Sequence, residues 1–330
     1  MKMHLLFMIL LVTSVNFYAQ VNKSLGINLE QYTYPYKVGY DTILSQQQNL
    51  VMAYMYELGG DSKGTVMLLH GKNFNGAYWG ETIKNLLAKG YNVFVPDQPG
   101  FGKSTKPQHY QYSFNQLAEN TRMVMDKLNI DKVIVIGHSM GGMLATRFAL
   151  MFPERVKQLI LENPIGLEDW RKWVPYKDID FYYDRELKKS RESTRQYMLT
   201  SYFHNEWKTS YDELVYLQTA FLQDPEYPLL AWNSALTYDM IITQPVVHEF
   251  QNLKVPTVLI LGQLDRTALG KEMVSKEVAA QMGNYPKLGK EISGKISNCQ
   301  LIELQGLGHI PHVENFNTFF DALMKVISTK

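Results

Sequence analysis

Short and almost uninterrupted apolar segments recur along this chain and limit the folds open to it. Strands buried on both faces of a parallel sheet have this character, whereas strands with one wet face alternate apolar and polar residues. Segments with helical spacing, such as 79–90 and 113–130, separate the apolar runs. This alternation predicts a doubly wound α/β domain with a mostly parallel sheet. The predicted strands are 65–71, 91–97, 132–139, 156–163, 255–262 and 299–304.

Two stretches depart from this alternation. Residues 49–64 have the composition of an antiparallel edge strand followed by a Gly-rich turn. The segment 164–250 has no strand-like run, and its stretches 186–199 and 210–222 are amphipathic helices. We interpret it as a helical lid (cap) inserted into a core formed by 20–163 and 251–330, with some of its aromatic residues lining a pocket. It holds four of the five tryptophans, Trp170, Trp173, Trp207 and Trp232.

The first 19 residues have the pattern of a secretory signal peptide. Lys2 is followed by a short apolar run, 5–12, and a small residue, Ala19, precedes Gln20. The run is too short for a comfortable membrane span. We therefore expect residues 1–19 to be a cleavable leader and the mature protein to be secreted or periplasmic, without membrane insertion. An uncleaved N-terminal anchor is the alternative.

Composition excludes several classes of function. The formal net charge is +1, which gives no reason to expect nucleic acid or an anionic membrane surface as a partner. Cys299 is the single cysteine, so neither an intramolecular disulfide nor a cysteine metal cluster is possible. No zinc-binding or dinucleotide-binding pattern is found, and we expect no metal and no organic cofactor. The partner expected is a small-molecule substrate.

Residues 137–141 read Gly-His-Ser-Met-Gly and join a predicted strand to a predicted helix. In this context a serine occupies a strained, sharp turn that exposes its Oγ above the sheet. Residues two positions away would collide there, so Gly137 and Gly141 must lack a Cβ. The pattern indicates that Ser139 is a nucleophile.

A serine nucleophile needs a base and an acid that orients the base. His309 follows the last predicted strand in a loop, and Asp265 follows the strand 255–262. The chain order nucleophile, acid, base, here Ser139, Asp265, His309, is one of the known orders of a serine catalytic triad. Two alternatives remain open: His312 as the base and Glu162, at the end of a strand, as the acid.

Backbone N–H groups complete the predicted site. The N–H of Met140 lies at a helix N-terminus, where a negative oxygen is favoured. A second donor is expected in the turn after His70-Gly71, from the backbone of Lys72 or, failing that, of Asn73. The Lys72 side chain is expected to be a solvated surface lysine.

The stretches 70–79, 96–107, 137–142, 261–265 and 306–314 together resemble the α/β-hydrolase superfamily, in order and spacing. The resemblance covers nearly all of the chain after the leader and implies a lidded, esterase-like serine hydrolase. Its motifs specify the fold and the triad much better than the substrate. A small or medium apolar carboxylic ester is the expected substrate. Alternatives are hydrolysis of a C–C bond in a diketone-like substrate by the same triad, and a non-catalytic binding protein.

Overall fold

The computed structural model describes residues 24–60 and 63–327 of the chain. The leader predicted at residues 1–19 lies outside the described residues and remains a prediction. Within the described ranges, no helix combines the length and the apolar character needed to cross a bilayer.

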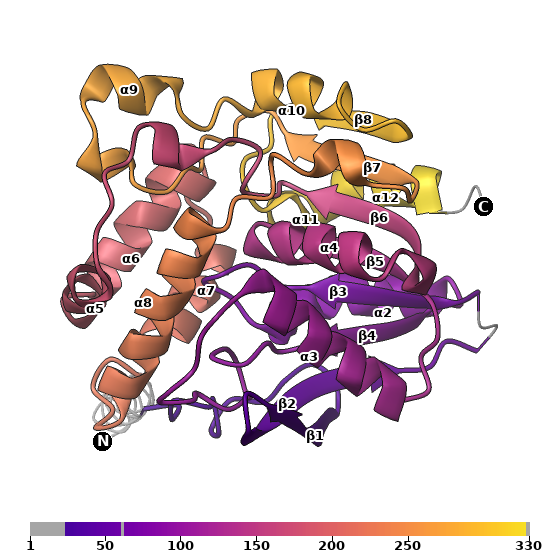
Figure 1. Cartoon of the computed structure of the whole chain (residues 1–330), viewed down its shortest axis with the longest axis horizontal. Coiled ribbons are helices and arrows are strands. Elements are labelled where there is room, and N and C mark those ends of the chain that lie inside the picture. The colour runs from indigo at the N-terminus through magenta and orange to yellow at the C-terminus, as the bar shows by residue number, and fades with distance from the viewer. Residues whose placement is uncertain (1–23, 61–62, 328–330) are drawn as a thin grey trace, which may run out of the picture.

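A mostly parallel sheet forms the centre of the molecule (Figure 1) and confirms the predicted α/β architecture. In the described part of the chain it has eight strands in the order β1-β2-β4-β3-β5-β6-β7-β8. The pairs β1–β2 and β2–β4 are antiparallel, and the other neighbours are parallel. The strands are β1 Val38–Ser45, β2 Gln48–Glu57, β3 Thr65–Leu69, β4 Asn92–Pro96, β5 Val133–His138, β6 Val156–Glu162, β7 Thr257–Gly262 and β8 Cys299–Leu304.

Alternate residues of the central strands enter two separate apolar clusters, one on each face of the sheet. Met67 and Leu69 of β3 share a cluster with residues of α3 (Phe114–Lys127), α4 (Met140–Met151) and α10 (Tyr285–Ser293). Val66 and Leu68 share the other cluster with residues of α2 (Gly80–Ala88) and α12 (Phe316–Ile327). Burial on both faces explains why these strands are continuously apolar in sequence.

The expected edge strand is not at the edge of the sheet. β2 pairs with β1 on one side and β4 on the other, so β1 is the edge. The sequence prediction of an edge at residues 49–64 was therefore wrong, and the strand 38–45 was missed. β1 alternates exposed and buried residues over only part of its length, and this weak pattern made it difficult to recognise.

The chain between β6 and β7 is helical and lies at the carboxyl ends of the parallel strands, on the left in Figure 1. We call residues 164–250 the helical insertion. Its α-helices are α5 Ile179–Leu187, α6 Arg191–Tyr197, α7 Asp212–Thr219 and α8 Tyr227–Thr243, and a π-helical turn spans Met198–Tyr202.

The single helix predicted over residues 186–199 is interrupted. Ser190 begins α6 with a capping box, in which its side chain accepts from the Ser193 N–H and the Ser193 side chain accepts from the Ser190 N–H. α5 ends before this cap, at Leu187. The local hydrogen bonds of Ser190 therefore divide what periodicity alone suggests is one helix.

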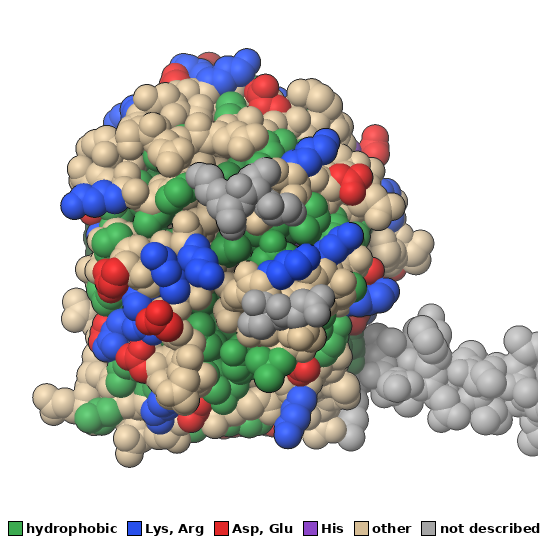
Figure 2. All heavy atoms as spheres, turned by 90° about the vertical axis from the view of Figure 1, so that its right-hand side faces the viewer, with side chains coloured by type: hydrophobic (Ala, Val, Ile, Leu, Met, Phe, Trp, Pro, Cys, Tyr) green, Lys and Arg blue, Asp and Glu red, His purple; other side chains and the backbone are tan. Residues whose placement is uncertain are grey.

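The face of the molecule opposite the insertion is shown in Figure 2. Lysine and arginine side chains are interspersed there with aspartate and glutamate, and apolar side chains lie between them. This face has no continuous surface of one charge, in agreement with the near-zero net charge of the sequence.

Candidate active site

Ser139 lies between the end of β5 and the start of α4. Its backbone has φ 56° and ψ −122°, a conformation that a residue with a side chain rarely adopts. A Cβ on Gly141 would overlap the Leu69 carbonyl oxygen, and a Cβ on Gly137 would overlap the carbonyl oxygen of Gly141. The neighbouring backbones therefore require both glycines, for the reason expected from the sequence.

His309 and Asp265 converge on Ser139 from loops that follow β8 and β7. The His309 Nε2 lies 3.0 Å from the Ser139 Oγ, and its Nδ1 lies 2.7 Å from the Asp265 Oδ2. Because a carboxylate can only accept, Nδ1 carries the proton and Nε2 accepts from the serine hydroxyl. The structure brings the three predicted residues together in one hydrogen-bonded line. All three side chains are buried.

Asn163 holds Asp265 in place, a role that sequence reasoning missed. The Asn163 Nδ2 donates to the Asp265 Oδ2 at 2.8 Å, and its Oδ1 accepts from the Gly262 N–H at 2.9 Å. The other carboxylate oxygen of Asp265 accepts from the Thr267 N–H at 2.7 Å. Asn163 directly follows a buried strand, and this position was the sequence signal that could have indicated its role.

The two alternative residues, Glu162 and His312, form a separate pair. The Glu162 Oε1 accepts from the His312 backbone N–H at 3.0 Å and from its Nδ1 at 2.9 Å. The His312 ring also stacks on Trp79, with ring centroids 4.2 Å apart. Within the described residues, neither alternative side chain hydrogen-bonds the Ser139 hydroxyl, and Glu162 contacts Ser139 only through its backbone carbonyl, which accepts from the Ser139 N–H at 3.3 Å.

One predicted oxyanion donor, Met140, lies at the start of α4 directly after Ser139, and the others lie in the turn after β3. A Cβ on Gly71 would be 3.1 Å from the Ser139 Cβ, so this turn passes directly over the serine. In the described part of the chain, the N–H groups of Met140 and Lys72 donate to no protein acceptor. They are available to an oxygen bound beside Ser139. The backbone N–H of the other candidate, Asn73, also donates to no acceptor among the described residues, while its side chain donates to the Tyr202 hydroxyl at 2.8 Å.

A hydrogen-bonded chain joins this turn to the His309 loop. The His138 Nε2 donates to the His309 carbonyl oxygen at 2.8 Å, so its Nδ1 is an acceptor and receives the Tyr78 hydroxyl at 2.9 Å. The Tyr78 oxygen accepts in turn from the Gly71 N–H at 3.1 Å. Burial and the neighbouring rings of His309 and His312 hold the pKa of His138 well below its usual value. His138 therefore stays neutral, as this arrangement requires.

Tyr202 brings the helical insertion into contact with the site. Its ring stacks on His309 with centroids 4.6 Å apart, and its carbonyl oxygen accepts from the His309 N–H at 3.0 Å. Burial raises the pKa of Tyr202 to about 12, so its hydroxyl remains neutral. Ser139 itself is only 5% exposed, which means that the insertion and the loops cover it in this conformation.

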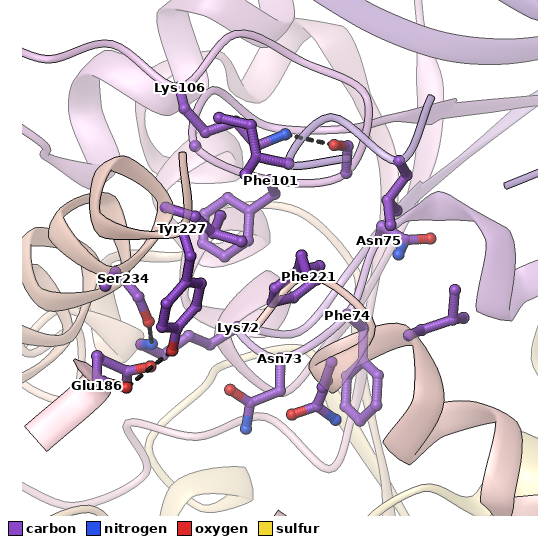
Figure 3. A pocket seen from close by; sticks show the side chains of 18 of the residues that line it. Lys72, Asn73, Phe74, Asn75, Phe101, Lys106, Glu186, Phe221, Tyr227 and Ser234 are labelled. Atoms are coloured by element: carbon purple, nitrogen blue, oxygen red, sulfur yellow. Dashed lines mark hydrogen bonds between the residues drawn. The ribbon is translucent and has the colours of Figure 1, made fainter. Parts of the chain in front are cut away.

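The Lys72 side chain is not the solvated surface lysine expected from the sequence. It is partly buried in a cavity of about 80 Å³ between the turn after β3 and the insertion (Figure 3), where its Nζ donates to the Ser234 Oγ at 2.8 Å. Burial lowers the pKa of Lys72 to about 8. The cavity lies beside the candidate oxyanion turn, and Ser139 does not line it.

Among residues 24–60 and 63–327, no three His, Cys, Asp or Glu side chains are grouped so that they could hold a metal ion. The half-buried Cys299 thiol hydrogen-bonds the Gln300 carbonyl, and burial raises its pKa to about 11. It lies on β8, and its raised pKa leaves it a weak nucleophile.

Comparison with known proteins identifies similar chains. The family model described as alpha/beta hydrolase fold matches residues 64–315. The crystal structure of a probable hydrolytic enzyme from Pseudomonas aeruginosa superposes with a TM-score of 0.91 at 45% identity, over 92% of this chain and 98% of that one.

Two curated relatives extend the comparison. The 2-hydroxy-6-oxo-6-phenylhexa-2,4-dienoate hydrolase of Burkholderia cepacia is 29% identical over 243 residues, which are 68% of this chain and 80% of that protein. An abhydrolase domain-containing protein of Caenorhabditis elegans is 39% identical over 114 residues. That match covers 33% of this chain and only 25% of the relative's own length.

Proposed function

Because the chain belongs to the family with the alpha/beta hydrolase fold, we propose that it is a serine hydrolase for small or medium apolar carboxylic esters. The observation that carries the proposal is the line of hydrogen bonds from the Ser139 Oγ through His309 to Asp265. Such a line activates a hydroxyl that is otherwise a weak nucleophile.

The geometry supports an acyl-enzyme mechanism. Ser139 attacks the ester carbonyl carbon while His309 accepts its proton at Nε2. Asp265 stabilises the imidazolium through the bond at Nδ1, and the N–H groups of Met140 and Lys72 stabilise the negative oxygen. His309 then returns the proton to the leaving alcohol, and water hydrolyses the acyl-enzyme by the same steps.

Closure of the helical insertion over the substrate belongs to this proposal. Tyr202 covers the His309 ring, and the nucleophile is almost fully buried. Entry of a substrate therefore requires the insertion or the neighbouring loops to move, after which closure would exclude water from the site. The insertion would then act as a lid.

Hydrolysis of a C–C bond is the second candidate, since the same triad can serve it. It is supported by the similarity to the Burkholderia cepacia dienoate hydrolase, which extends over 68% of this chain. A non-catalytic binding role is the third candidate, and it is disfavoured because all three triad positions are filled and connected.

A labelling experiment with substrate panels separates the candidates. A fluorophosphonate probe should label the protein at Ser139, and the Ser139→Ala variant should resist labelling. Turnover of 4-nitrophenyl esters without turnover of 2-hydroxy-6-oxo-dienoates would support the esterase, and the reverse would support the C–C hydrolase. Absence of both labelling and turnover would favour the binding protein.

We also propose that residues 1–19 are a leader removed on export, leaving a secreted or periplasmic protein. The sequence pattern of those residues supports this proposal. Intact mass measurement of protein recovered from the periplasm or medium of an expressing bacterium tests it. Recovery of the uncleaved chain in the membrane fraction would instead favour the N-terminal anchor.

A further inference from the structure

The cavity beside the candidate oxyanion turn is lined by more cationic than anionic side chains. Its walls come from the turn after β3, the loop after β4, and the α5, α7 and α8 regions of the helical insertion. Apolar groups such as Phe101 and Phe221 form part of the wall (Figure 3). The charged residues in the lining are Lys72, Lys106, Lys189 and Glu186.

The acceptors in the cavity do not balance these cations. The Glu186 carboxylate lies 4.0 Å from the Lys189 Nζ, so it already has a cationic partner. Lys106 donates to the carbonyl oxygens of Gly102 and Ser104, the latter at 2.9 Å. Three ammonium groups therefore share one carboxylate within the lining.

The Lys72 ammonium has donors that the described part of the protein leaves unused. It has three N–H donors, and within the described residues its one hydrogen bond goes to the Ser234 Oγ, at 2.8 Å. No carboxylate of the described chain lies within 4.0 Å of its Nζ. Its other favourable neighbours are the face of the Tyr238 ring, 5.8 Å from the Nζ, and the Glu186 carboxylate, which acts on it from beyond 4.0 Å. A partly buried cation with free donors is stabilised by a bound anion.

The cavity is also close enough to the nucleophile for one substrate to reach both. Gly71, the residue before Lys72, passes over Ser139 so closely that a Cβ there would be 3.1 Å from the serine Cβ. The Lys72 backbone therefore faces the site while its side chain enters the cavity. To reach the ammonium, a group attached to the acyl carbon by a short chain has to extend past this turn, which becomes feasible when the insertion moves to admit the substrate.

We propose that this cavity is a subsite for a carboxylate on the substrate, with Lys72 as the residue that binds it. The substrate class is then an ester whose acyl chain ends in a carboxylate, such as a half-ester of a short dicarboxylic acid. This inference rests on the proposed serine-hydrolase function and replaces the apolar acyl end of the proposed ester with a carboxylate. A singly charged carboxylate matches the donors that the Lys72 ammonium leaves free and the small volume of the cavity.

A pair of substrates that differ only in charge tests the proposal. One is the 4-nitrophenyl monoester of hexanedioic acid, and the other has a carboxamide in place of the free carboxylate. We expect kcat/KM to favour the carboxylate by about tenfold or more, since a hydrogen bond to a charged group has that effect. Lys72→Met should abolish most of this preference, and Lys72→Arg should retain it.

The comparison uses the ratio of the two kcat/KM values, because a change at Lys72 can also disturb its backbone N–H. Lys84→Met, on the exposed surface of α2, removes the same charge away from the cavity and should leave the ratio unchanged. Equal or better hydrolysis of the carboxamide by the wild-type protein would overturn the proposal. So would a preference for the carboxylate that Lys72→Met leaves intact.

Binding provides a readout that does not depend on turnover. Calorimetry with hexanedioate on the Ser139→Ala variant should show binding that Lys72→Met weakens by about tenfold or more. Binding of hexanedioate with no hydrolysis of either ester would contradict the esterase and support the subsite. Hydrolysis of both esters without binding of the diacid would contradict the subsite and support the esterase.

Discussion

Two histidines three residues apart, His309 and His312, have different carboxylate partners. The His309 Nδ1 contacts Asp265 at 2.7 Å, and the His312 Nδ1 contacts Glu162 at 2.9 Å. Both pairs are buried. The first pair reaches the Ser139 Oγ, whereas the second packs against Trp79. Their substitution should therefore separate a loss of activity from a loss of stability.

We predict that Asp265→Asn lowers kcat by about three to four orders of magnitude, because an amide neither fixes the His309 tautomer nor stabilises its positive charge. Glu162→Gln should leave kcat within about tenfold and lower the free energy of unfolding by about 1–3 kcal/mol, the usual cost of a weakened buried hydrogen bond. Steady-state kinetics and urea denaturation measure the two effects. A larger loss of kcat in Glu162→Gln would identify Glu162 as the functional acid.

Tyr78 is predicted to position the groups on either side of Ser139. Tyr78→Phe leaves the Gly71 N–H and the His138 Nδ1 without their shared partner. At about 1–3 kcal/mol for such a loss, we expect kcat to fall about tenfold or more while KM changes little. Tyr32→Phe is the matched control, because its hydroxyl donates to Glu213 at an exposed site. A rise in KM with kcat unchanged would assign Tyr78 to substrate binding instead.

The sequence predicted the site residues that follow the ends of strands. Ser139, Asp265 and His309 follow β5, β7 and β8, and the carboxyl ends of parallel strands meet at one edge. It favoured Asp265 on chain order and kept Glu162 as an alternative, because both occupy such positions. Tyr78 and His138 were missed because their contacts depend on how two loops fold over each other, and local pattern does not encode this.

At the scale of elements, the turn between β5 and α4 depends on close approach of backbones. Gly141 lies in the first turn of α4, where alanine would raise helix propensity by about 1 kcal/mol. Its Cβ would, however, overlap the carbonyl of Leu69 in β3. Overlap with the backbone of a central strand cannot be relieved by a side-chain rotation, so the overlap outweighs the gain in propensity.

We therefore predict that Gly141→Ala lowers the free energy of unfolding by about 2–3 kcal/mol or more and abolishes fluorophosphonate labelling of Ser139. Gly60→Ala is the control, since a Cβ there meets no atom of the described residues within 4 Å and its φ is not in the left-handed region. Urea denaturation and labelling rates provide the measurements. A Gly141→Ala protein with wild-type stability and labelling would show that the turn adjusts without cost.

The elements themselves were predicted unevenly. Strands buried on both faces, such as β3 and β5, were located to within about two residues because their apolar runs are continuous. The boundary between α5 and α6 was missed, since it depends on the hydrogen bonds of Ser190. α8, Tyr227–Thr243, was also missed, because nine of its residues are buried on several sides and it lacks a clear polar face.

On the scale of the whole molecule, the core and the helical insertion meet around the cavity that holds Lys72. The insertion supplies most of the groups that face its ammonium. Lys189 and Arg185 are cations there, and Glu186 is the anion: burial raises its pKa, but the nearby cations lower it overall. The tyrosines 227 and 238 of α8 stay neutral because burial raises their pKa. The charge that a substrate meets in the cavity is therefore set jointly by core and insertion.

This arrangement predicts how the preference for a carboxylate substrate depends on pH. Burial lowers the pKa of Lys72 to about 8 and that of Lys106, in the same cavity, to about 7. Both are cations below these values and lose their charge as the pH rises through them. Because kcat/KM reports groups of the free enzyme, the ratio of the carboxylate to the carboxamide substrate should be highest below pH 7. It should then fall as the pH rises from 7 to 9.

Lys72→Arg separates the two titrations, since a guanidinium keeps its charge throughout this range. In that variant the decrease near pH 8 should disappear, and only the smaller one near pH 7, from Lys106, should remain. The carboxamide substrate is the internal reference, because the titration of groups shared by both reactions cancels in the ratio. A ratio in the wild-type protein that stays constant from pH 6 to 9 would mean that no lysine of the cavity interacts with the carboxylate.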